Sequence, residues 1–308
     1  MGMRFRGFAT AVIASAAVGA VFSLAAIGTS GQAPAGQAPA AGQGAGRGAG
    51  QGAGRGAGQA AGRGAAAGRI PRNAWDNHPN LNGVWQALNT ANWDLQDHGA
   101  APGQFYQLGA LGAVPPGQTV VEGGDIPYLP AAAEQKRKNY VNRLTDDPEV
   151  KCYLPGIPRA TYVPYPFQIV QSPKNILMAY EYASANRVVN MEKPTEAPVD
   201  SWMGWSNGKW EGDTLVVDVK SLNGHAWLDR VGDYTTDNAH IVERFTMTDA
   251  DHINYEATIE DNKVFSRPWK ISMPLYKRVE KNAQLLEFKC VEFAEEMLYG
   301  HLRKGAVK

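Results

Sequence analysis

The residue with the clearest chemical potential is a glutamate inside an otherwise apolar strand pattern. In the run HIVERFTM, side chains alternate between two faces, and Glu243 shares the more apolar face with Ile241, Phe245 and Met247. A carboxylate among apolar side chains is costly unless it is paired or protonated. This makes Glu243 a candidate general acid or base. The alternative interpretation is an internal salt bridge or hydrogen bond that holds two strands together.

Two further titratable side chains lie close to Glu243 in the sequence. His240 begins the same run, and Asp229 ends the string HAWLD upstream of it. We predict that His240 is a proton carrier, with Asp229 or Glu243 as its orienting partner. The alternative is a surface histidine or one with a structural hydrogen bond. The spacing matches no carboxylate–histidine metal motif, and His240 and Glu243 fall on opposite strand faces. We therefore expect no metal and no cofactor at these residues.

A second set of residues is suited to binding a small apolar or aromatic molecule. Arg159 lies in the rigid string CYLPGIPR, where it suits either recognition of a planar anion or fastening of a loop. The aromatic residues downstream are dense enough to line an apolar or sugar-stacking pocket, although such residues also pack on strands. The ligand-binding residues that we predict are Arg159, Trp202, His225, Trp227 and Tyr182.

Several classes of function are disfavoured by what the sequence lacks. It contains neither a G-x-S-x-G nucleophile motif nor a phosphate-binding GxxxxGK loop. The first 72 residues hold seven arginines and no acidic residue, which leaves 23 basic against 30 acidic residues in the remainder. Nucleic-acid binding requires a basic surface, so the acidic balance of the remainder argues against a nucleic-acid partner.

The first 69 residues of the chain divide into two segments of distinct composition. Residues 1–30 have the order of a secretory signal peptide, with Arg4 and Arg6 before an apolar stretch; an uncleaved anchor is the alternative. Residues 31–69 form a Gly/Ala/Gln/Arg tether, in which an eight-residue repeat spans 43–66. We expect residues 70–308 to form one β-rich domain. The protein should be periplasmic or secreted, with no stable membrane insertion after cleavage of the signal.

The export signal bears on the two cysteines. Cys152 and Cys290 are the only ones in the chain, and thiol pairs in oxidising compartments usually form disulfides. We predict a disulfide between them. The alternative is two separate buried thiols.

The folded part is predicted to be mainly β. Turn formers dominate residues 71–130, with short strand signals at residues 83–88 and 118–122. A helix is expected over residues 131–144, and a short one near residues 292–303. From residue 167 onward, nine strand-like runs follow one another, joined in several places by short polar turns, and the last is QLLEFKCVEF. This pattern predicts an antiparallel meander closed into a lipocalin-like barrel, or alternatively folded as a sandwich.

Several uncommon strings occur together in this chain, among them NLNGVWQ, CYLPGIPR, SWMGWSNGKWEGDTLVV, HAWLD, HIVERF and TIEDNKVFSRPW. In this combination the chain resembles a large group of exported, mostly uncharacterised proteins common in acidobacteria and proteobacteria. The resemblance covers about residues 70–304 and implies export, but no particular activity. Members of that group tend to read MGHS where this chain has a tryptophan at position 205, and His-Ser where it has Thr236-Asp237.

Two functional hypotheses follow from these residues. The first is an exported β-barrel with a small-molecule cavity that acts as a cofactor-independent acid–base enzyme, either a hydrolase, a lyase or an isomerase. Its catalytic residues would be Glu243, His240 and Asp229. The alternative is a non-catalytic small-molecule carrier or an envelope interaction protein. Catalysis requires titratable groups that converge in one pocket, whereas binding requires only a concave wall with an anchor.

Overall fold

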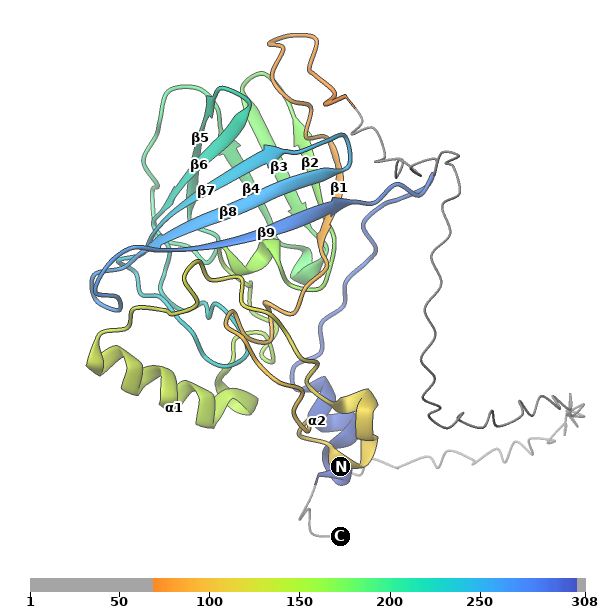
Figure 1. The fold of residues 1–308 in the computed structure, drawn as a ribbon, viewed down its shortest axis with the longest axis vertical. Coiled ribbons are helices and arrows are strands. Elements are labelled where there is room, and N and C mark those ends of the chain that lie inside the picture. The colour runs from red at the N-terminus through yellow and green to blue at the C-terminus, as the bar shows by residue number, and fades with distance from the viewer. Residues whose placement is uncertain (1–68, 304–308) are drawn as a thin grey trace, which may run out of the picture. The chain divides into compact units, whose positions relative to one another are not determined.

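The computed structural model describes residues 69–303, so the predicted signal peptide and all but the last residue of the predicted tether lie outside the described residues. Nine strands form a closed barrel (Figure 1). The strands are β1 (Gly83–Ala87), β2 (Phe167–Gln171), β3 (Asn175–Tyr180), β4 (Asn186–Asn190), β5 (Trp205–Glu211), β6 (Thr214–Lys220), β7 (His240–Met247), β8 (His252–Glu260) and β9 (Trp269–Lys277). The helices are α1 (Pro130–Asp146) and α2 (Ala294–Tyr299), with 3-10 turns at Tyr106–Gly112, Arg159–Thr161, Tyr182–Ser184 and Gly300–Leu302.

The barrel closes through β1, which pairs with both β2 and β9. All neighbouring strands are antiparallel except β4 and β5, which are parallel and pair Val189 with Ser206. The prediction of a purely antiparallel meander was therefore wrong at one step, because the long connection between β4 and β5 returns the chain in the same direction. Closure into a barrel is confirmed over the sandwich. The likeness to a lipocalin stays a prediction.

Side-chain alternation determines what fills the barrel. In β7, β8 and β9 every second residue is buried, as expected for strands with one face towards a core. The predicted inward face of β7 is confirmed, with Glu243 fully buried between apolar neighbours. The interior side chains include Phe167, Met178, Tyr180, Val217, Phe245, Tyr255, Ile271 and Met273, all at most 3% exposed. The described barrel interior is therefore largely filled with side chains.

The elements outside the barrel agree only in part with those predicted from the sequence. The two predicted helices are confirmed as α1 and α2. The predicted strand over residues 284–293 was wrong: this segment is a strap without strand pairing, because β1 already occupies the edge of β9. The strand signal at residues 118–122 was also wrong and gives a single bridge between Val121 and Ile271. Within residues 69–303, no helix has the length and apolar character needed to cross a membrane.

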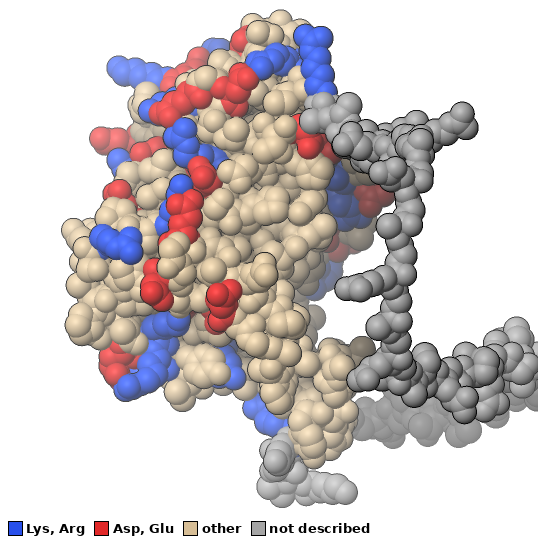
Figure 2. Space-filling model, in the orientation of Figure 1, with Lys and Arg blue, Asp and Glu red and all other residues tan. Residues whose placement is uncertain are grey.

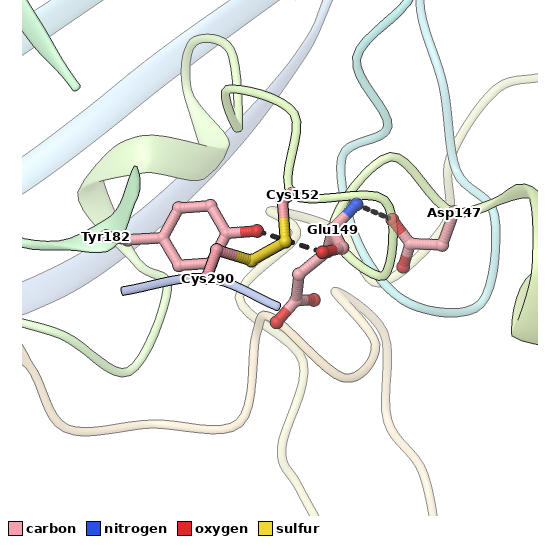
Figure 3. The surroundings of a disulfide bond; sticks show 5 residues. All are labelled: Asp147, Glu149, Cys152, Tyr182 and Cys290. Atoms are coloured by element: carbon pink, nitrogen blue, oxygen red, sulfur yellow. Dashed lines mark hydrogen bonds between the residues drawn. A yellow bond between two sulfur atoms is a disulfide. The ribbon is translucent and has the colours of Figure 1, made fainter. Parts of the chain in front are cut away.

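The predicted disulfide is confirmed. Cys152 and Cys290 are joined, with their Cα atoms 5.7 Å apart. The bond ties the strap to the irregular chain that follows α1 (Figure 3). Figure 1 shows α1 and α2 at one end of the barrel and the segment that leads into β1 at the other end. On the face drawn in Figure 2, acidic and basic side chains are interspersed, with no large field of one sign.

Candidate functional site

Inside the barrel, Glu243 is part of a fully paired network. Arg187 on β4 donates to both of its carboxylate oxygens, from Nη1 at 2.5 Å and Nη2 at 3.0 Å. The Tyr255 hydroxyl donates to Oε1 at 2.8 Å, and Arg187 Nε donates to the Tyr180 hydroxyl at 3.1 Å. Since β4 and β7 are not neighbouring strands, the pair connects two separate parts of the barrel wall through the interior. This geometry matches the alternative interpretation of Glu243 as half of an internal salt bridge.

The second predicted catalytic residue lies on the outside of the barrel. His240 faces outward at the start of β7, with Nε2 2.9 Å from Asp218 Oδ2 and Nδ1 3.2 Å from Glu260 Oε2. These partners come from β6 and β8, the two strands that flank β7. The expected orienting residues, Asp229 and Glu243, do not contact His240, because β7 points Glu243 to the opposite face.

Asp229, the third predicted catalytic residue, lies in a buried acidic cluster outside the barrel strands. Its carboxylate accepts hydrogen bonds from the backbone N–H groups of Leu95, Val231 and Asp233 at 3.0–3.1 Å. Burial and the neighbouring charge of Asp233 raise the pKa of Asp229 well above its usual value. Oxygens of Asp94, Asp229 and Asp233 lie within 4.8 Å of one another.

This acidic cluster is the set of described residues whose oxygens could hold a metal ion. It already contains one positive charge, since Lys136 Nζ lies 2.9 Å from Asp233 Oδ1. Tyr128 donates a hydrogen bond to the same oxygen at 2.7 Å. Asp229 and Asp233 are fully buried, so the cluster offers a substrate little access to the carboxyl groups. The expectation that the protein uses no metal stays a prediction.

Arg159 fastens loops in the structure. It is 1% exposed and donates to Asn92, to both oxygens of Asp147 and to Glu149 at 2.7–3.2 Å. Gly156, three residues earlier, has φ +71° and no room for a side chain, because a Cβ there would lie 2.5 Å from the Cβ of Ala226. This close approach holds the segment CYLPGIPR against the chain around Ala226, and Arg159 at the end of the segment is buried. Its guanidinium is fully engaged within the chain.

Glu149 joins this network to a second arginine. Arg230 donates to both of its oxygens at 2.6 and 2.8 Å, and Arg159 donates to one of them. Burial alone would raise the pKa of Glu149, but the charges of Arg230 and Arg159 outweigh burial and lower this pKa to about 2. Figure 3 shows Glu149 beside the disulfide, where its backbone carbonyl accepts a hydrogen bond from the Tyr182 hydroxyl at 3.2 Å.

The lowered pKa of Glu149 predicts a pH-dependent stability. A carboxyl whose pKa falls from 4.5 to about 2 on folding stabilises the protein by about 3 kcal/mol above pH 5. This contribution is lost as the pH falls through the interval between those two values. We expect Glu149→Gln to lower the free energy of unfolding at pH 7 by about this amount, and the difference from the native protein to shrink steadily below pH 4.5. Urea unfolding between pH 7 and pH 3 measures this difference, and a constant difference would contradict the prediction.

The remaining predicted ligand-binding residues fall into three places. Trp202 and His225 lie together, with ring centroids 5.8 Å apart, and the ring centroid of Tyr153 lies 5.1 Å from that of Trp202. The Trp227 side chain is buried, with only 9% of its surface exposed. Tyr182 packs against Phe288 of the strap at 5.0 Å. From the predicted set, Trp202 therefore contacts His225, and Arg159 and Tyr182 both contact Glu149.

A pocket of about 60 Å³ lies at the β2–β3 end of the barrel and was not found from the sequence. It is lined by Asn73, Trp75, Asp76, Gln171, Ser172, Pro173, Ile176, Met191 and Trp210. Asn73 is 4% exposed, and its Oδ1 atom is buried without a hydrogen-bond partner in the described part of the chain. Buried polar atoms are nearly always paired, so this oxygen is the feature of the pocket that requires explanation.

A wider hollow of about 450 Å³ runs beside the strap. It is lined by Pro166, Glu181, Arg278, Glu280, Lys281, Asn282, Ala283, Gln284 and Leu286. Several of its polar groups are engaged within the chain. Arg278 pairs with Glu280, and Glu181 accepts the backbone N–H of Leu286 at 2.7 Å. Neither hollow is lined by Glu243, His240 or Asp229.

The described chain thus defines a disulfide-linked, closed nine-stranded β-barrel with a small pocket at one end. In comparisons with known proteins, no protein-family model and no curated protein matches the sequence.

Proposed function

We propose that this protein is exported and binds a small molecule, without catalysing its conversion, in the pocket beside Asn73. The observation that carries the proposal is the unpaired, buried Oδ1 atom of Asn73 in a cavity lined by two indole rings. A bound donor would supply the missing hydrogen bond. An exposed indole offers the apolar wall that small-molecule sites commonly use, and Trp75 is 48% exposed.

Binding is favoured over acid–base catalysis because the three predicted catalytic residues do not converge. Glu243 is paired inside the barrel, His240 lies outside it, and Asp229 is buried in the acidic cluster. An acid–base enzyme needs at least two such groups around one substrate position. The carrier hypothesis requires only the pocket.

Export to the periplasm or beyond rests on two independent features. Residues 1–30 have the composition of a signal peptide. The Cys152–Cys290 disulfide is typical of proteins that mature in an oxidising compartment. A barrel of this kind would then present the pocket close to the end of the Gly-rich tether, since the pocket residues begin at Asn73.

A ligand-observed NMR screen of the purified protein tests the proposed binding site. The mixture would contain small alcohols, amines, carboxylates, sugars and aromatic compounds. We expect at least one of them to show saturation transfer that is lost in Trp75→Ala. Trp205→Ala is the matched control, because Trp205 is also a partly exposed tryptophan but does not line the pocket. Binding that survives in Trp75→Ala, or its absence for every compound, would overturn the proposal.

A further inference from the structure

The donors and acceptors of the pocket beside Asn73 narrow the chemistry of its ligand. The Asn73 amide nitrogen donates one hydrogen bond, to the carbonyl of Pro79 at 3.4 Å, whereas its oxygen has no partner among the described residues. The Gln171 side chain is used at both ends, accepting from the N–H of Leu81 at 2.5 Å and donating to the carbonyl of Pro79 at 3.3 Å. The Ser172 hydroxyl donates to the carbonyl of Asn175 at 2.9 Å. Each amide nitrogen and the hydroxyl of the lining therefore already donates one hydrogen bond, and the buried side-chain atom of the lining left without any partner is the oxygen of Asn73.

The acceptors that the pocket offers are one buried oxygen and one carboxylate. Beside Asn73 Oδ1, the lining contains the exposed carboxylate of Asp76, which accepts the backbone N–H of His78 at 3.0 Å and has no ion-pair partner among the described residues. The remaining side-chain donors are the indole N–H groups of Trp75 and Trp210. A ligand group that donates hydrogen bonds can satisfy the Asn73 oxygen, whereas an ionised carboxylate cannot, because it only accepts them.

The charges in and around the pocket favour a cationic ligand group. The pocket lining contains one carboxylate and neither lysine nor arginine. Three cations lie next to lining residues in the sequence, and each is already paired: Arg72 with Asp213 at 2.5 Å, Lys174 with Glu192 at 3.1 Å and Lys209 with Glu211 at 2.7 Å. Of the charged residues in the lining and directly next to it in the sequence, Asp76 is the one with no ion-pair partner in the described part of the chain.

The aromatic rings add a third preference. Trp75 and Trp210 both line the cavity, and the ring of His78 stacks on Trp210 with centroids 4.7 Å apart. The face of an indole attracts a cation, and indole does so better than the other aromatic side chains. A cavity needs roughly 10–15 Å³ to hold a water molecule, so about 60 Å³ accommodates one small head group.

We propose that this pocket binds the primary ammonium group of a small amine, with Asn73 Oδ1 and the Asp76 carboxylate as acceptors and the two indoles as walls. This inference rests on the proposed function and specifies its ligand class. The ammonium group is the small head group that supplies donors, a positive charge and a fit to indole faces at once. The rest of the amine extends past the exposed ring of Trp75 into solvent.

Calorimetric titration with n-butylammonium, 1-butanol and butyrate tests the inference, since these probes share a chain and differ in the charge of the head group. We expect n-butylammonium to bind more tightly than either of the others. Asp76→Asn should weaken its binding about tenfold, because a charge-assisted hydrogen bond is replaced by a neutral one. Asp125→Asn is the matched control, because Asp125 is exposed and does not line the pocket.

The possible outcomes separate this inference from the proposed function. If butanol or butyrate binds as tightly as the amine and binding requires Trp75, the pocket is a binding site but the ammonium inference is wrong. An amine affinity that Asp76→Asn leaves unchanged overturns the inference in the same way. If none of the probes and none of the screened compounds binds in a Trp75-dependent manner, the proposed function fails as well. A further probe is Nα-acetyl-lysine N-methylamide, which keeps the free ε-ammonium group of a lysine side chain. If it binds more tightly than n-butylammonium, the partner is a polypeptide rather than a free amine.

Discussion

Replacing Arg187 by methionine is expected to lower the free energy of unfolding by about 3–5 kcal/mol, because it leaves the carboxylate of Glu243 buried without its partner. Glu243 is 0% exposed and Arg187 is 5% exposed, so solvent cannot replace the lost hydrogen bonds. Tyr255 alone would still donate to Glu243. Urea unfolding followed by tryptophan fluorescence measures the change.

The double variant Arg187→Met with Glu243→Leu separates this cost from a simple loss of packing. Replacing both members of a buried ion pair by apolar side chains of similar volume is often neutral or stabilising. We expect the double variant to recover most of the stability that the single variant loses. A single variant that loses less than about 1 kcal/mol, or a double variant that is less stable than the single one, would contradict this account of the barrel interior.

Removing the disulfide is the second change with a large expected effect. The bond spans 138 residues of sequence, and the loop-entropy relation gives about 5 kcal/mol for a closed loop of that size. The double replacement Cys152→Ser with Cys290→Ser should therefore unfold at much lower urea concentration than the native protein. It should also loosen the strap. The aromatic contacts of Phe288 with Tyr165 and Tyr182 should weaken as a result.

Reduction of the native protein provides the control for the disulfide variant. The reduced protein and the double serine variant should have the same unfolding midpoint, and non-reducing mass spectrometry of the native protein should show the two cysteine peptides linked. An unfolding midpoint that reduction leaves unchanged would show that the bond does not constrain the unfolded chain as expected.

The sequence pattern predicted what depends on local alternation. The inward position of Glu243 follows from the two-residue period of a strand, and the helix α1 follows from a run of good helix formers. The partner of Glu243 could not be predicted in this way. Arg187 lies 56 residues earlier in the chain, and the two side chains meet only because the closed barrel turns both β4 and β7 towards one interior.

Closure of the barrel also explains the strand that was predicted wrongly. The run QLLEFKCVEF alternates as a strand would, but pairing needs a free sheet edge. That edge is taken by β1, which comes from residues 83–87 and pairs with β9. The strap therefore crosses outside the barrel and is held by Cys290 instead. Such competition between distant segments cannot be read from the local pattern of either one.

The pocket beside Asn73 depends on long-range contacts in the same way. Asn73, Trp75 and Asp76 lie in a turn-rich stretch just after the repeat segment, and their residue types alone did not single them out. Their significance depends on Gln171 and Trp210, which approach them from β2 and β5. A tryptophan among turn formers is the one sequence signal that points to this place.

The most direct test of small-molecule binding at the barrel end is an indole NMR titration. The chain contains eight tryptophans, whose N–H signals can be assigned by single replacements with phenylalanine. Titration of the ¹⁵N-labelled protein with n-butylammonium should shift the signals of Trp75 and Trp210 and leave that of the buried Trp85 in place. Shifts centred on Trp202 or Trp227, or no shift at any indole, would contradict binding of the amine in this pocket.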